Sequence, residues 1–180
     1  MKLTTTNSLK NIPAEAWNAL AGDANPFVQH DFLLALETGN CLLPYGWQPH
    51  YLLAHENNDL IGAAPAYIKN NSYGEFVFDW AWAEAYHKNG LQYYPKLVIA
   101  TPYSPVTGPR LLTRENDSAT KLTLVNFAIE QAQQLNLSSV HCLFNLADDH
   151  SAEVQAGLMP RFDYQFHWHN DGYQDFADFL

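Results

Sequence analysis

Residues 47–69, WQPHYLLAHENNDLIGAAPAYIK, decide the fold, because two strand-like apolar runs stand there on either side of a short polar turn. The turn residues Asn57, Asn58 and Asp59 tolerate the backbone conformations that a hairpin needs. We expect an antiparallel pair of strands over residues 47–55 and 60–69. The chain is therefore expected to contain an antiparallel sheet.

Two helices are predicted before the hairpin. The segment AEAWNALAG, residues 14–22, follows Pro13 and ends at a glycine, which is the usual asymmetry of a helix start and stop. The segment HDFLLALETG, residues 30–39, places apolar side chains on one helical face and also ends at a glycine. A helical layer is therefore expected to precede the strands.

Strands and helices alternate after the hairpin. Asp117 can cap the longest predicted helix, residues 118–136, because its carboxylate can accept hydrogen bonds from the first free backbone amides. The other predicted elements are a helix from near Trp80 to Gly90, a strand at 96–100, a rigid proline-rich loop at 101–111, a strand at 138–145, a helix at 148–157 and a strand at 161–170. Together they predict a mixed α/β domain.

Composition and charge exclude several classes of protein. The chain has 180 residues, 47% of them hydrophobic and only 16% charged, which is enough apolar surface for one domain and too little charge for a coiled coil or a disordered tail. Its formal net charge of −10 repels phosphate backbones and anionic lipid surfaces. Broad nucleic-acid binding is therefore not expected.

The expected location is the cytoplasm. The N-terminal segment MKLTTTNSLKNIPAEAW lacks the apolar core of a signal peptide, and no 18-residue apolar run could span a membrane. Cys41 and Cys142 are isolated in sequence, so neither a disulfide framework nor a thiolate metal knuckle is indicated.

Six segments, in order along the chain, resemble a known family. They are NPF at 25–27, GWQPHYL at 46–52, SYGEFVFDWAWAEAY at 72–86, YYPKL at 93–97, PYSPVTGPRLL at 102–112 and QFHWHNDGYQDFADFL at 165–180. These strings are similar to those of the FemAB-like predicted N-acyltransferases, bacterial-type proteins also labelled as peptidoglycan-biosynthesis or GNAT-like proteins. The resemblance implies an α/β, GNAT-like fold with a mixed, mainly antiparallel sheet flanked by helices.

The resemblance also implies a two-half protein. Residues 1–180 are then a single GNAT-like domain, the N-terminal half, and a basic stretch would follow it. The segment 172–180 carries Tyr173, Phe176 and Phe179 at helical spacing, an apolar stripe that needs a cover. We expect a truncated domain that docks on a second GNAT-like half or self-associates, with full independent folding as the alternative.

Asp79 is the first candidate for catalysis. A carboxylate among the large rings of Trp80 and Trp82 tends to have a raised pKa and can serve as a general base, while the two tryptophans would bind substrate. The alternative is that Asp79 caps the helix it precedes and that the tryptophans fill the core. Lys96, at the start of a strand, could orient a carboxylate or phosphate, but a solvated lysine is the preferred interpretation.

The proline-rich loop is a candidate ligand site. Tyr103 and Thr107 offer hydroxyl groups, Gly108 allows a close backbone approach, and Arg110 can hold a carboxylate or phosphate through two hydrogen bonds. The resemblance implies that a GNAT enzyme would place the diphosphate of acyl-coenzyme A there, on helix N-terminal amides. The usual Q/R-x-x-G-x-G/A signature is missing, and a purely structural turn is the alternative.

His167 and His169 lie two residues apart on a predicted strand, which would place both imidazoles on one face. Similarity to the family string FHWHN favours catalytic roles in a substrate cleft. A metal site would need further ligands that the sequence does not indicate, and histidines that only form hydrogen bonds are a second alternative. We predict that Asp79, Tyr103, Arg110 and the two histidines line one concavity.

Two functions follow. The first is acyl or aminoacyl transfer to a small-molecule or peptide-like amine acceptor, with acyl-coenzyme A or aminoacyl-tRNA as donor. The second is a non-catalytic half-domain that binds substrate or docks on a partner. Nucleophile elbows, Walker loops and Rossmann fingerprints are absent, so hydrolase, nucleotide-hydrolysing and dinucleotide-dependent functions are disfavoured.

Overall fold

The structure, a computed structural model, describes residues 1–180 and has a mixed α/β fold. The helices are α1 (Ala14–Ala21), α2 (His30–Thr38), α3 (Trp80–Lys88), α4 (Ser118–Gln134), α5 (Ala147–Gln155) and α6 (Phe176–Phe179). The strands are β1 (Lys2–Thr6), β2 (Trp47–Pro49), β3 (Tyr51–Glu56), β4 (Asp59–Ala64), β5 (Ala66–Lys69), β6 (Lys96–Ile99), β7 (Leu112–Thr113) and β8 (Val140–Cys142). Every helix is too short or too polar to cross a membrane.

The predicted hairpin is confirmed, but each of its strands is broken at a proline. β2 ends at Pro49 and Pro65 separates β4 from β5, because proline has no N–H to continue the ladder. β3 pairs with β4, whereas β2 pairs with β5 in a second sheet. Asn57 and Asn58 make the turn with positive φ angles of 49° and 71°, as asparagine readily does.

Two four-stranded sheets result, in the orders β1-β3-β4-β7 and β2-β5-β6-β8. All neighbours are antiparallel except β6 and β8, which are parallel and are connected through α4. The prediction of a mixed, mainly antiparallel sheet flanked by helices is confirmed. β1 and β7 were not predicted, because five and two residues in polar surroundings give a weak strand signal.

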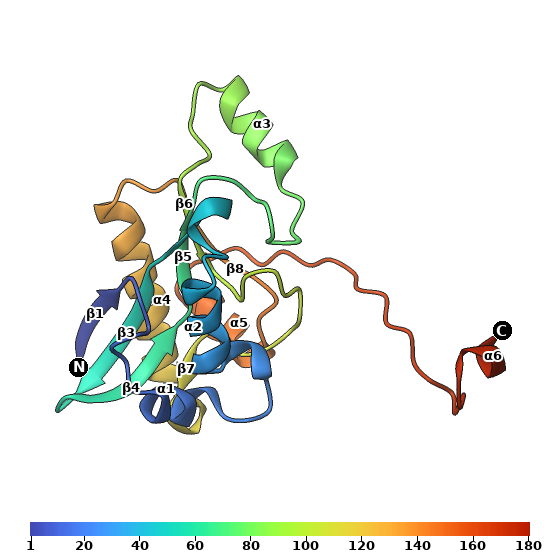
Figure 1. Cartoon of the computed structure of the whole chain (residues 1–180). Coiled ribbons are helices and arrows are strands. Elements are labelled where there is room, and N and C mark those ends of the chain that lie inside the picture. The colour runs from blue at the N-terminus through green and yellow to red at the C-terminus, as the bar shows by residue number, and fades with distance from the viewer.

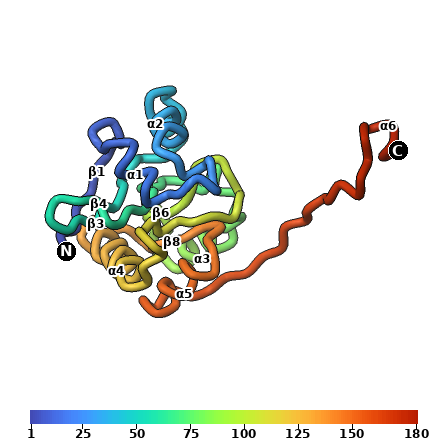
Figure 2. Tube along the Cα trace, turned by 90° about the horizontal axis from the view of Figure 1, so that it is seen from below, coloured from blue at the N-terminus to red at the C-terminus, as the bar shows by residue number.

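The core lies on both faces of the strands. Tyr51 and Leu53 of β3 pack into one apolar cluster with α1 and α2, and the alternate residues Leu52 and Ala54 pack into a second cluster with α4. Figure 2 shows α1 and α2 on one side of the strands and α4 on the other. Asp117 caps α4 through its side chain, as predicted.

Residues 70–95 form an excursion between β5 and β6. They leave the end of β5, carry α3 away from the body of the molecule, and return to the start of β6 (Figure 1). No residue of α3 is buried. The prediction of a helix in this segment is confirmed, but the helix has no face in the core.

The C-terminal tail, residues 158–180, runs away from the domain after α5 and ends in α6 (Figures 1 and 2). The predicted strand at 161–170 is wrong: these residues form neither helix nor strand, and all are exposed. Alternating side chains suit a strand only where a neighbouring strand offers its backbone for pairing, and the structure brings none to this segment.

Candidate functional site

The excursion begins and ends at neighbouring points of one sheet. β5 and β6 are antiparallel, and Lys69, the last residue of β5, lies opposite Lys96, the first residue of β6. Directly opposed residues of an antiparallel pair project on the same face. Two lysines therefore meet at the base of the excursion, and the segment between them supplies the surrounding side chains.

Lys96 lies at the centre of a buried charge cluster, which consists of Lys69, Ser72, Glu75, Asp79, Tyr93 and Lys96. Its Nζ atom is 2.8 Å from Oε2 of Glu75 and 2.6 Å from Oδ2 of Asp79, and all three side chains are almost completely buried. The interpretation of Lys96 as a solvated lysine is wrong. A buried ammonium needs paired anions to offset its lost hydration, and the excursion provides two.

Three hydroxyl groups extend the cluster. Tyr93 donates to Oδ2 of Asp79 at 2.7 Å, and Lys96 donates to Oγ of Ser72 at 3.2 Å. Ser72 is also within 2.7 Å of the hydroxyl of Tyr94, whose side chain is partly exposed. A continuous hydrogen-bonded path therefore joins the surface at Tyr94 to the buried carboxylates.

The two carboxyl groups have opposite electrostatic character. Burial raises the pKa of Glu75, although the Lys96 charge opposes the rise. Burial also pushes the pKa of Asp79 upward, but hydrogen bonds led by that of Lys96 outweigh it and leave this pKa below its ordinary value. Two acids with divergent pKa values in one site are characteristic of acid–base chemistry.

Lys69 and His141 border the cluster. Burial lowers the pKa of Lys69 to about 8, against the opposing Glu75 charge, and its Nζ lies 3.9 Å from the ring centroid of Trp47. Burial and the Lys96 charge lower the pKa of His141 to about 4, so this imidazole is neutral at physiological pH. Its ring meets that of Tyr93 edge to face.

Three buried polar atoms in this region have no hydrogen-bond partner. They are Oε1 of Glu75, Oδ1 of Asp79 and Nε1 of Trp47. A buried polar atom without a partner is costly and rare, and it marks a place where a further donor or acceptor fits. Two of the three are carboxylate oxygens, which accept N–H groups.

The excursion exposes five large aromatic side chains, here called the aromatic surface: Tyr73, Phe76, Phe78, Trp80 and Trp82. Trp80 and Trp82 are 59% and 53% exposed, so the alternative that the tryptophans fill the core is wrong. Trp82 lines an apolar hollow of about 280 Å³ with two alanines of α3. Asp79 occupies the N-cap position of α3, but its side chain makes no capping bond, so the capping alternative is wrong as well.

The proline-rich loop touches the excursion through Tyr103. The Tyr103 amide donates to the carbonyl of Gly74 at 3.2 Å, and its hydroxyl donates to the carbonyl of Cys41 at 2.5 Å. A Cβ on Gly74 would lie 2.7 Å from the Tyr103 ring, so only glycine, here with a φ of 78°, allows this approach. The structure therefore brings two of the candidate segments together.

Arg110 and Gly108 have structural roles in the same loop. The buried guanidinium of Arg110 donates to the carbonyls of Leu143 at 2.8 Å, Val106 at 2.7 Å and Pro109 at 3.1 Å. The Gly108 amide donates to the carbonyl of Phe144 at 2.9 Å. This arrangement matches the alternative of a structural turn, in which Arg110 is buried. Thr107 is exposed at the tip of the loop.

His167 and His169 lie on the exposed tail. Their rings stack with centroids 6.4 Å apart, and no third histidine, cysteine or acidic side chain joins them in a metal-binding group. The side chain of Gln165 donates to the carbonyl of Pro105 at 2.8 Å, which ties the tail to the proline-rich loop. The structure does not bring the two histidines into one concavity with Asp79.

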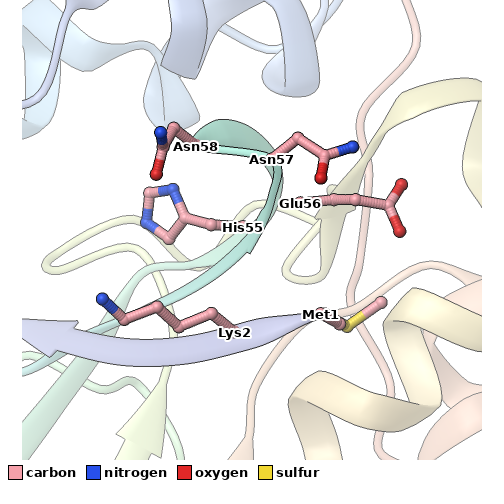
Figure 3. A pocket seen from close by; sticks show the side chains of 6 residues that line it. All are labelled: Met1, Lys2, His55, Glu56, Asn57 and Asn58. Carbon is pink, nitrogen blue, oxygen red and sulfur yellow. The ribbon is translucent and has the colours of Figure 1, made fainter.

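A second hollow lies at the turn between β3 and β4 (Figure 3). It measures about 360 Å³ and is lined by Met1, Lys2, His55, Glu56, Asn57 and Asn58. These side chains surround the turn between β3 and β4 and are separate from the charge cluster. No hydrogen bond or ion pair joins His55 to Glu56 in this hollow.

The sequence analysis missed Glu75 and Ser72 as members of the site and preferred a solvated role for Lys96. A usable signal was present: Glu75 and Asp79 are the acidic residues of the aromatic string at 72–82, and Lys96 begins an otherwise apolar strand. A lysine inside an apolar strand needs an anion to offset its lost hydration. Glu75 and Asp79, the two carboxylates among the aromatic residues before this strand, were the candidates.

The fold is shared with several solved acetyltransferases. The structure matches the aminoglycoside 6'-N-acetyltransferase of Acinetobacter haemolyticus with a TM-score of 0.53 at 15% identity, covering 94% of this chain and 99% of that one. It matches the ribosomal-protein-alanine N-acetyltransferase of Brucella melitensis with a TM-score of 0.52 at 12% identity, covering 93% and 100%. An aminoglycoside N-acetyltransferase in complex with CoA gives 0.52 at 11% identity, covering 94% and 99%. At these identities the matches show the GNAT fold alone.

The sequence itself points to a narrower group. No curated protein matches it significantly. A family model named FemAB-like, described as peptidoglycan biosynthesis/recognition, matches residues 8–180, which is nearly the whole chain. The chain belongs to the FemAB-like family.

Proposed function

We propose that this chain is an N-acyltransferase domain that receives an amine acceptor at the buried charge cluster. FemAB-like membership and the acetyltransferase neighbours support a general role in acyl transfer to nitrogen. The family description favours a peptide-like amine as acceptor. A fold alone does not define a function, which depends on the residues and the geometry of the site.

The observation that carries the proposal is the pair of unpartnered carboxylate oxygens. Oε1 of Glu75 and Oδ1 of Asp79 are buried and free, while Lys96 holds the other oxygen of each carboxylate. A primary amine or ammonium group offers N–H donors of the kind these oxygens accept. Lys96 fixes both carboxylates in place before the acceptor arrives.

The divergent pKa values assign separate roles to the two acids. Glu75, whose pKa is raised, suits the general base that takes a proton from the acceptor nitrogen. Asp79, whose pKa is lowered, suits a permanently charged group that orients the N–H bonds. We therefore propose Glu75 as the general base in place of Asp79, four residues later.

The proposed reaction exchanges one bond at the acyl carbon for another. The acceptor nitrogen forms a bond to the acyl carbon of an activated donor, and the bond from that carbon to the leaving group breaks. The leaving group, the thiolate of coenzyme A or a ribose oxygen of tRNA, departs with the electron pair and takes up a proton from solvent. One proton passes from nitrogen to Glu75, and the path through Lys96, Ser72 and Tyr94 connects this carboxyl group to solvent.

Access to the cluster requires α3, which follows Asp79, to move. Glu75 and Asp79 are only 3% and 1% exposed. Because α3 buries none of its residues, displacing this helix disrupts little of the core. The aromatic surface, with Trp80 and Trp82, then offers flat faces for the remainder of the acceptor.

The test is acyl transfer measured with acetyl-coenzyme A or aminoacyl-tRNA and a panel of peptide-like amines. We expect Glu75→Gln to lower kcat by about 10²–10⁴-fold, the usual effect of losing a general base. Glu84→Gln is the matched control, since Glu84 lies exposed on α3 in a surface pair with Lys88. Circular dichroism checks that both variants fold. Equal turnover by the two variants would overturn the proposed role of Glu75.

A docking half-domain is the second candidate function. The observation that favours it is the large exposed aromatic area on the excursion and on the tail, where Phe166 and Trp168 are largely exposed. In this alternative residues 1–180 are one domain of a two-domain protein, or they self-associate. Light scattering tests it: a monomer that transfers acyl groups unaided would contradict docking as the main function.

A further inference from the structure

We infer that the N-terminus of α4 is closed to the diphosphate of coenzyme A, so that the acyl donor of this domain is held without that anchor. This inference rests on the proposed acyl transfer and narrows its donor. The fold implies acyl-coenzyme A with its diphosphate on the N-terminal amides of the helix that follows the loop. In this chain that helix is α4, which the short helix η3 (Arg114–Asn116) precedes.

The amides at this helix start already bind an anion of the chain itself. The carboxylate of Asp117 accepts hydrogen bonds from the backbone amides of Ala119 and Thr120, both at 3.2 Å, and from the Thr120 hydroxyl at 2.5 Å. These are the groups that a helix offers to phosphate. A diphosphate would have to displace a carboxylate that is covalently tethered beside them.

Further carboxylates surround the same position. Glu115 precedes Asp117 and is exposed, and Asp148 of α5 accepts a hydrogen bond from the side chain of Asn116 at 2.5 Å. Arg114 is the exposed cation of this junction, because Lys121 of α4 is buried and paired with Asp149. Asp117, Glu115 and Asp148 therefore outweigh Arg114, and the net negative charge repels a diphosphate at close range.

The backbone of the junction also lacks the form of a phosphate cradle. A cradle presents successive amides from a glycine-rich turn, where the absence of side chains lets the phosphate approach. Here Glu115 and Asn116 occupy positive φ angles of 49° and 58°, positions that would suit glycine. Both positions thus carry a side chain where a glycine would leave the backbone open.

The adjoining loop is closed by its own contacts. Gly108 forms a bridge with Asn145 next to β8, and Asp149 of α5 accepts from the amides of Arg110 and Leu111 at 2.6 and 3.3 Å. Lys121 of α4 donates to the other oxygen of Asp149 at 2.6 Å. The loop, α4 and α5 are thus held together by buried hydrogen bonds, which a ligand entering between them would have to break.

Titration of the wild-type chain with coenzyme A and with acetyl-coenzyme A tests the inference. We expect no saturable heat in calorimetry at millimolar ligand and no shift of the Ala119 and Thr120 amide signals in NMR spectra. Saturable binding that shifts these two amide signals would overturn it.

A charge-neutralised variant tests the stated cause. Asp117→Ser keeps a capping hydroxyl, and it is combined with Glu115→Gln and Asp148→Asn. The control carries Asp23→Ser, Glu15→Gln and Asp31→Asn, three exposed acids distant from α4 that change the net charge equally. We expect the first variant to bind coenzyme A at least tenfold more tightly than the control; equal affinities would contradict the electrostatic argument.

The outcomes separate this inference from the proposed function. Consumption of acetyl-coenzyme A by the wild type with an amine acceptor would overturn the inference and leave the acyltransferase proposal standing. Absence of coenzyme A binding, together with no transfer from any donor, would refute the acyltransferase proposal and leave the inference intact. Transfer only from a donor without a diphosphate would support both.

Discussion

Replacing Lys96 with methionine should destabilise the protein more than any surface substitution. The ammonium of Lys96 lies 2.8 Å from Glu75 and 2.6 Å from Asp79, and all three side chains are buried. Methionine keeps the apolar stem but leaves two carboxylates buried without their cation. Removing one partner of a buried ion pair costs about 3–5 kcal/mol. In a chain of this length, about 2–4 °C of Tm is lost per kcal/mol, so we expect a fall of about 6–20 °C.

Urea unfolding at neutral pH, followed by circular dichroism, measures the effect on the free energy of unfolding. Lys88→Met is the matched control, because Lys88 belongs to an exposed pair with Glu84, and such pairs contribute about 0–1 kcal/mol. Combining Lys96→Met with Glu75→Gln and Asp79→Asn should recover most of the loss, since neither carboxylate is then charged and only Lys69 of the cluster can still carry a charge. A single Lys96→Met variant within about 1 kcal/mol of the wild type would refute the reasoning.

The pH dependence of the free energy of unfolding is an independent test of the same cluster. In the wild type the pKa of Asp79 lies below its unfolded value of 3.8, so its stabilising contribution is present above that value and is lost as the pH falls through the folded pKa. In Lys96→Met, burial acts on Asp79 without the lysine, and its folded pKa rises above the unfolded one. This variant should therefore gain stability relative to the wild type as the pH falls, and a constant difference would contradict the assignment.

Three further predictions concern the proline-rich loop and α5. Arg110→Met leaves the carbonyls of Leu143 and Val106 unpaired and should lower the free energy of unfolding in urea by about 2–4 kcal/mol. Arg114→Met, at an exposed site, should change it little. Similar losses for the two variants would argue against the structural role of Arg110. Burial raises the pKa of Glu153 from 4.5 to about 7, so its contribution is present below the unfolded pKa and is lost as the pH rises through about 7. Glu153→Gln should accordingly gain stability relative to the wild type between about pH 5 and pH 8, and a pH-independent difference would disprove the shift. Gly108→Ala places a Cβ 1.9 Å from Nδ2 of Asn25 and should cost about 1–3 kcal/mol, part of which Asn25→Ser should relieve; strictly additive effects would show that the two residues do not clash.

The site residues differ in how far the sequence could place them. Tyr103 and the excursion are brought together, and the aromatic string contains two buried acids. Arg110, predicted to hold a ligand, uses its guanidinium on backbone carbonyls of its own domain. A residue type shows which bonds a side chain can form, but only the folded chain shows which partners have already taken them.

The sequence by itself determined the elements whose signals are local. The hairpin follows from Asn57 and Asn58 between apolar runs, and α4 follows from its apolar spacing and the cap at Asp117. These features depend on residues within a few positions of one another, where propensity and periodicity act directly. The same reasoning failed at 161–170, because an alternating pattern becomes a strand only beside another strand.

Only the tertiary structure decided which charged side chains meet and how their pKa values shift. Lys96 meets Glu75 and Asp79 across 21 and 17 residues of chain, and Arg110 meets Leu143 across 33. Folding places a lysine at a strand start in the centre of a charge cluster. Burial there raises the pKa of Glu75, whereas hydrogen bonds led by that of Lys96 lower the pKa of Asp79. Such contacts and the loss of water around them arise only when distant segments pack together, so no local pattern in the sequence specifies them.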